Sequence, residues 1–74
     1  MNYYRVTCNT INEACYSCES PEKAAQLFIE DSHNGRQVNF GTYDLKVWVL
    51  ENEFFVSCGI YKTTLKPLTT VEKI

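Results

Sequence analysis

The stretch from Tyr43 to Tyr61, YDLKVWVLENEFFVSCGIY, decides the fold because it predicts a β-hairpin. Apolar residues alternate with other residues on both sides of a polar segment at positions 51–53. We expect four apolar pairs on one face: Val49 with Phe54, Val47 with Val56, Leu45 with Cys58, and Tyr43 with Ile60. A shift by one residue would place Val47 opposite Ser57 and break the apolar row, so the pattern favours this register.

The opposite face of this hairpin carries an aromatic pair. In the same register Trp48 lies opposite Phe55, and Lys46 lies opposite Ser57. Successive strand residues point to opposite faces of a sheet, so this second row should point away from the core. We therefore expect Trp48 and Phe55 on an open sheet face.

A second hairpin is predicted near the N-terminus, where residues 3–8 and 13–19 alternate in hydrophobicity. The apolar pairs expected there are Cys8 with Ala14, Val6 with Tyr16, and Tyr4 with Cys18. The connection from Asn9 to Asn12 has a turn-forming asparagine at each end, which suits a hairpin.

A helix start follows at Ser20-Pro21-Glu22. Ser20 can accept a hydrogen bond from a first-turn amide, Pro21 suits the first helical position, and Glu22 favours the positive end of the helix dipole. Five apolar residues then fall on one helical arc: Ala24, Ala25, Leu27, Phe28 and Ile29. The sequence predicts an amphipathic helix from Pro21 to Ser32, ended by a left-handed residue at Asn34-Gly35.

This order of elements predicts a small single-domain ββαββ fold of the α+β class. One amphipathic helix should cover one face of an antiparallel or mixed four-stranded sheet. A β-bulge at Gly41-Thr42 would bring Val38 and Phe40 onto the same face as the strand that follows. We expect the domain to span residues 1–66. Because Pro67 interrupts strand pairing, we expect residues 67–74 to form a tail that is frayed or makes a short helical turn.

Length and charge limit the function. The chain has 74 residues, 45% of them hydrophobic, and a formal charge of −2, as in one small folded domain. Its seven Lys and Arg residues are scattered, so the basic footprint of a duplex DNA binder is lacking. No run approaches the roughly 20 apolar residues of a membrane span, and the first residues lack the apolar core of a signal peptide. We expect a complete, cytoplasmic open reading frame with no membrane partner.

Four cysteines suggest a zinc site, because Cys15 and Cys18 have C-x-x-C spacing and Cys8 and Cys58 could complete a quartet. Within a strand, however, residues three apart point to opposite faces. Core packing of small buried thiols is the favoured interpretation, ahead of a metal site and of a disulfide or redox role. We therefore expect no metal and no cofactor.

The side chains that could perform catalysis are isolated from one another. His33 is the only histidine and lies at the predicted helix end, where a cationic imidazole is favourable for the helix dipole. Glu51 and Glu53 flank the hairpin turn, and no two carboxylates have a spacing that would separate their pKa values. The sequence argues against an enzyme.

The open sheet face is the strongest candidate for a binding site. We expect it to display six partner-binding residues: Tyr3, Arg5, Lys46, Trp48, Phe55 and Tyr61. Aromatic residues and arginine are enriched in protein interfaces, and a tryptophan can dominate the binding energy. Two structural alternatives remain. Trp48 and Phe55 could serve only as a cross-strand pair, worth about 0.2–1 kcal/mol, or the apolar residues of the tail could cover them.

No motif of a known family is recognisable in this sequence. A tiny α+β domain without catalytic residues has the general look of the small accessory proteins that phages and other mobile elements encode. Together with the expected exposed aromatic residues, this look favours a non-enzymatic module that binds another protein and inhibits or modulates it by steric occlusion. Trp48 and Phe55 would then anchor in a pocket of the partner, with the polar residues at the rim. One alternative is a single-stranded nucleic-acid binder that uses the same face, although the acidic chain argues against it. The other is a structural homodimer joined through sheet faces or edge strands.

Overall fold

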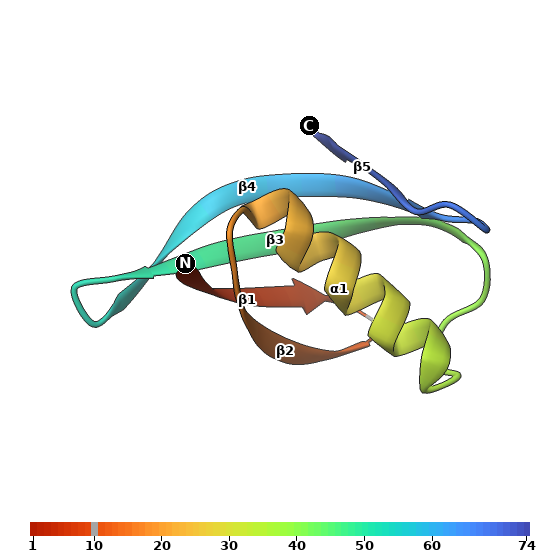
Figure 1. The fold of residues 1–74 in the computed structure, drawn as a ribbon, viewed down its shortest axis with the longest axis horizontal. Helices are drawn as coiled ribbons and strands as arrows, with labels where there is room; N and C mark the ends of the chain where they lie inside the picture. Colours follow the sequence, from red (N-terminus) through yellow and green to blue (C-terminus); the bar gives the residue numbers. More distant parts are fainter. Residues whose placement is uncertain (10) are drawn as a thin grey trace.

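The computed structural model describes residues 1–9 and 11–74, which form one helix and five strands. In chain order these are β1 (Asn2–Cys8), β2 (Ile11–Cys18), α1 (Pro21–Asn34), β3 (Gly41–Glu51), β4 (Phe54–Leu65) and β5 (Thr70–Lys73). All neighbouring strands are antiparallel, and their order across the sheet is β2-β1-β3-β4-β5. Figure 1 shows α1 lying along one face of this sheet.

The predicted α+β class is confirmed, but the sheet has five strands instead of four. The fifth strand lies in the segment that we expected to be a frayed or helical tail. Pro67 ends β4, yet the chain turns back and residues 70–73 pair with Tyr61–Thr64 of β4. The tail therefore extends the edge of the sheet instead of covering the open face.

The N-terminal hairpin has the predicted faces but a different register. Tyr4 lies opposite Tyr16 and Val6 lies opposite Ala14, two residues away from the expected pairing. A shift of two residues preserves the direction of every side chain, so Tyr4, Val6 and Cys18 are buried as expected. The turn that we expected from Asn9 to Asn12 contains Thr10, which lies outside the described residues.

Helix α1 begins where the sequence predicts. The backbone N–H of Lys23 donates to Ser20 Oγ at 3.1 Å, and Pro21 occupies the first helical position. The four most deeply buried apolar residues of the helix face the sheet: Ala24, Ala25, Phe28 and Ile29. Burial of a side chain such as Phe28 contributes about 1.5–3 kcal/mol to folding.

The helix ends two residues later than predicted, and its left-handed residue is not a glycine. Gly35 has an ordinary φ of −79°, whereas Arg36 has a φ of 61°. The N–H of Arg36 donates to the carbonyl of His33, and the N–H of Gln37 donates to the carbonyl of Ser32, at 2.9 and 2.8 Å. These two bonds define a Schellman motif with Arg36 in the position that glycine usually occupies.

The central hairpin turns one residue later than expected. Asn52 and Glu53 both have positive φ, of 48° and 73°, as a type I′ turn requires. Val49 consequently lies opposite Val56, and the predicted pairs Val49–Phe54 and Val47–Val56 are wrong.

A β-bulge at Cys58 then changes the register again. Trp48 pairs with Ser57 but Val47 pairs with Gly59, so Cys58 is an extra residue in β4. Gly59 takes a φ of +117°, and its N–H donates to Ser57 Oγ at 3.2 Å. The predicted pairs Leu45–Cys58 and Tyr43–Ile60 are therefore wrong as well. The expected bulge at Gly41-Thr42 is also wrong, because this part of β3 pairs in unbroken register with β4.

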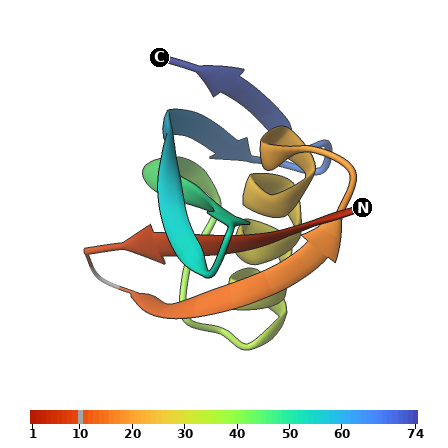
Figure 2. The ribbon, with the colours of Figure 1, turned by 90° about the vertical axis from the view of Figure 1, so that its left-hand side faces the viewer.

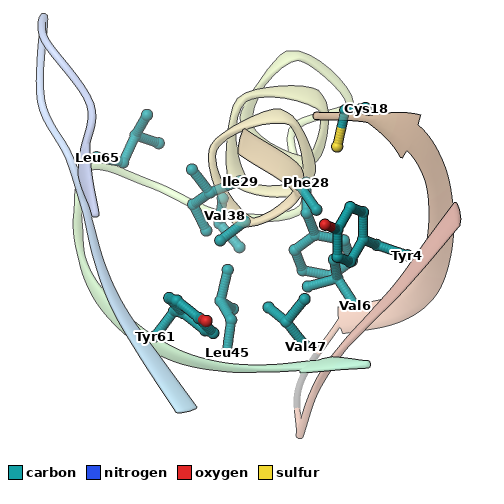
Figure 3. Packing of buried hydrophobic residues seen from close by; sticks show 12 residues of the cluster. Tyr4, Val6, Cys18, Phe28, Ile29, Val38, Leu45, Val47, Tyr61 and Leu65 are labelled. Atoms are coloured by element: carbon teal, nitrogen blue, oxygen red, sulfur yellow. The ribbon is translucent and has the colours of Figure 1, made fainter. Parts of the chain in front are cut away.

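The bulge decides which residues of β4 enter the core. Beyond it, Tyr61 lies opposite Leu45 and Thr63 lies opposite Tyr43, on the face that α1 covers. Ile60 points to the other face, where it pairs with Lys46. The sheet curves around the helix, and Figure 3 shows core side chains from β1, β3 and β4 converging on Phe28 and Ile29.

The β3–β4 hairpin projects beyond the rest of the sheet in Figure 1, and its turn points toward the viewer in Figure 2. In the described part of the chain, β1 pairs with β3 only as far as Val49, and β5 pairs with β4 only from Tyr61 onward. We call residues 50–56 the hairpin tip. This tip is a two-stranded ribbon with its turn at the end of the molecule.

We predict opposite effects for alanine at two glycines. Gly59→Ala should lower the free energy of unfolding by about 1–3 kcal/mol, because a β-carbon is strained at this φ. That atom would also approach Lys73 Cε to 3.2 Å. The matched control Gly35→Ala should raise stability by about 0.4–1 kcal/mol, because its φ is ordinary and the nearest atom lies at 3.4 Å. Urea unfolding followed by circular dichroism measures both, and equal tolerance of the two changes would contradict the bulge.

Candidate interaction surface

The open face of the sheet carries two rows of side chains that cross β1, β3 and β4. The rows follow from the strand registers: Arg5, Trp48 and Ser57 form one, and Thr7, Lys46 and Ile60 form the next. Tyr3 and Phe55 continue the surface toward the hairpin tip, with ring centroids 6.3 Å apart. Five of the six residues predicted for this face therefore lie on it.

The sixth residue, Tyr61, is on the wrong side of the sheet for the predicted role. It is only 2% exposed and lies in the core, where its hydroxyl donates to the carbonyl of Cys58 at 3.5 Å. Burial is the main cause that raises the pKa of its phenol. Tyr61 cannot touch a partner while the domain is folded, because the bulge at Cys58 turns it inward.

Trp48 is half-buried in the middle of the face. Its indole Nε1 is enclosed, and no described residue accepts a hydrogen bond from it. A buried N–H without an acceptor costs about 1–3 kcal/mol of desolvation. The ring thus stabilises the sheet by packing, whereas its N–H lowers the stability of the isolated domain.

The two cations on this face have separate surroundings. Arg5 Nε forms an ion pair with Glu13 Oε2 of the neighbouring strand β2, so part of its charge is neutralised. Lys46 lies in the next row, beside a pocket of about 300 Å³ that is also lined by Thr7, Asp44 and Ile60. Acidic side chains therefore accompany both cations, and the described residues of this face form no uninterrupted basic track.

Besides Phe55, the hairpin tip carries three exposed apolar residues that we did not assign to the site from the sequence. Leu50 and Phe55 lie on the open face, whereas Phe54 and Val56 lie on the opposite side of the ribbon. These four side chains have exposed fractions of 37–75%, with Phe54 the most exposed. The uninterrupted run Phe54-Phe55-Val56 could have indicated this exposure in the sequence. Three successive apolar residues in a strand place at least one side chain on each face of the sheet.

The cysteines are distributed over both sides of the sheet. Cys15 is exposed on the open face and Cys18 is buried on the helix side, as their spacing within one strand predicts. Burial is the largest cause raising the pKa of the Cys18 and Cys58 thiols. Within residues 1–9 and 11–74, no group of three or more histidine, cysteine or acidic side chains is placed to hold a metal ion.

His33 takes part in local structure at the end of α1. Its Nδ1 donates to the carbonyl of Val38 at 3.1 Å, and its ring stacks on Phe40 with centroids 4.8 Å apart. These contacts fix the segment between α1 and β3. They account for the position of the imidazole ring.

Comparisons with protein-family models, curated proteins and solved structures found no match for this chain. No helix among the described residues has the length and apolar character needed to cross a bilayer.

We predict that the Trp48 ring, and not its N–H, stabilises the sheet. Trp48→Phe should leave the free energy of unfolding unchanged or raise it by up to about 1 kcal/mol, because it removes a buried N–H that has no acceptor. Trp48→Ala should lower it by about 1–2 kcal/mol through lost apolar burial. Urea unfolding followed by circular dichroism tests both variants. A phenylalanine variant as unstable as the alanine variant would contradict this account.

Proposed function

We propose that this chain is a non-enzymatic, cytoplasmic protein-binding module that inhibits or modulates its partner by steric occlusion. Its contact surface is the hairpin tip together with Tyr3 and Trp48 on the adjoining open face. The tip inserts into a hollow of the partner, and the rest of the domain blocks access to that hollow.

The observation that carries the proposal is the exposure of apolar side chains on both sides of the hairpin tip. Exposed large apolar side chains that gather in one part of a small protein mark a surface that becomes buried on binding. Two of these residues, Phe54 and Phe55, are aromatic and of the type that supplies anchors in protein interfaces.

The position of these residues supports the same conclusion. Apolar residues in a strand normally stabilise the fold by packing against a second layer, but the tip lies beyond the strands β1 and β5 that flank the hairpin. A two-stranded ribbon alone is only marginally stable in water. Keeping Phe54 at the end of such a ribbon contributes little to folding, so a contact outside the chain is its best explanation.

Single-stranded nucleic acid is a weaker candidate for the same face. Stacking of bases would need accessible aromatic rings with cations beside them to hold the phosphates. Trp48 is half-buried, and Arg5 is paired with Glu13. The chain as a whole is acidic. A protein partner fits these features better.

A photocrosslinking experiment tests the proposal. The amino acid p-benzoylphenylalanine replaces Phe54 in one variant and Leu68 in another, and both proteins are expressed in the cells from which the gene comes. Leu68 is the matched control, because it is 82% exposed and lies in the connection between β4 and β5, away from the tip. We expect one discrete crosslinked protein from position 54 and none from position 68.

The captured protein then allows a quantitative measurement. Phe54→Ser should weaken binding by roughly 2 kcal/mol, as the loss of an interface anchor does, while Leu68→Ser leaves it unchanged. Equal crosslinking from both positions, or none from position 54, would contradict the proposal. A crosslink between two copies of this chain would instead support the homodimer.

A further inference from the structure

The hairpin tip carries negative charge and no positive charge. Glu51 and Glu53 flank Asn52 at the turn, and all three residues are exposed. The sequence contains no lysine, arginine or histidine between Lys46 and Lys62. The apolar side chains of the tip are therefore accompanied only by carboxylates.

A further carboxylate belongs to the helix, which begins toward the same end of the molecule. Glu22 is exposed in the first turn of α1, and Figure 1 shows this start of the helix on the side of the projecting hairpin. At the base of the projection, burial is the largest cause that raises the pKa of the Cys58 thiol. Lys73, whose side chain reaches Gly59, lowers this pKa, and Glu51 and Glu22 raise it to a smaller extent. Beyond that point, toward the turn, the ribbon has only acidic charges.

This negative charge favours some binding partners of the hairpin tip over others. Two copies joined tip to tip across a twofold axis would bring four carboxylates together, two from each copy, and like charges in an interface are strongly disfavoured. A nucleic acid would place phosphates against the same carboxylates. A protein surface with cationic side chains would instead be attracted before contact and held in register afterwards.

We propose that the hairpin tip docks into a groove of a protein partner that has apolar walls and a rim of lysine or arginine side chains. This inference rests on the proposed function and specifies its partner. Phe54, Phe55 and Val56 enter the groove, while Glu51 and Glu53 meet the cationic rim. The carboxylates accelerate association, and the apolar side chains slow dissociation.

Two synthetic peptides test the charge selection directly. Both are amphipathic helices, one built only from leucine and lysine and the other only from leucine and glutamate. Each is titrated into ¹⁵N-labelled protein while amide chemical shifts are recorded. We expect the leucine–lysine peptide to shift the amides of residues 50–56 and the leucine–glutamate peptide to leave them unchanged.

Matched variants separate a local effect from general attraction between a cation and an acidic protein. Glu51→Gln/Glu53→Gln removes two charges from the tip, and Asp44→Asn/Glu72→Gln removes two charges that flank Lys62 in the sheet. The tip variant should bind the leucine–lysine peptide roughly tenfold more weakly at low salt, and the control should bind it like the wild type. Phe54→Ser should also weaken binding.

Three results would overturn this inference. These are equal shifts with both peptides, equal weakening in the two charge variants, or no shift at the tip with either peptide. The proposed function is judged separately, because a crosslink from position 54 to a partner without a cationic rim would uphold it while contradicting the charge selection.

Discussion

A single extra residue in β4, Cys58, reverses the sheet face to which the following residues of this strand point. On the turn side of the bulge, Ser57 and Phe55 share the open face with Trp48. On the other side, the same face receives Ile60, and Tyr61, Thr63 and Leu65 turn toward the helix. Gly59 makes the change possible, because it adopts a φ that a residue with a β-carbon rarely takes. Without the bulge Ile60 would enter the core in place of Tyr61, and the large aromatic ring would lie outside.

The bulge also divides the β3–β4 hairpin into a part that packs in the domain and a part that projects from it. On the C-terminal side of the bulge, β4 lies between β3 and β5 and is covered by α1, so its apolar residues stabilise the domain. Toward the turn, the hairpin extends past the helix, and the apolar residues of the hairpin tip stay exposed. Bulges increase the local twist of a strand pair, which suits a ribbon that departs from a curved sheet. The bulge thus lies at the boundary between the part of the hairpin that completes the core and the part that we propose for binding.

The sequence predicts those parts of the fold that depend on neighbours in the chain. The cap at Ser20 and the apolar arc of α1 are local signals, and both are confirmed. The faces of β1 and β2 are confirmed as well, although the register was wrong, because alternation fixes a face but not a partner. The turn at Asn52-Glu53, the bulge at Cys58 and the pairing of β5 depend on contacts between strands. The prediction that Tyr61 lies on the open face was wrong because it did not include the bulge. Five candidate site residues lie on the open face as expected: Tyr3, Arg5, Lys46, Trp48 and Phe55. The projection of the hairpin tip could not be predicted, because it depends on the order of the strands in the sheet and on where their pairing ends.

The central claim is the register change at Cys58, and cross-strand nuclear Overhauser effects measure it most directly. With the bulge in place, Leu45 should show contacts to Tyr61, and Val49 should show contacts to Val56. Tyr61 should also show contacts to side chains of α1. If Val49 contacts Val56 but Leu45 contacts Ile60, the strands pair without the bulge. In that case Tyr61 lies on the open face, and the core described here is wrong.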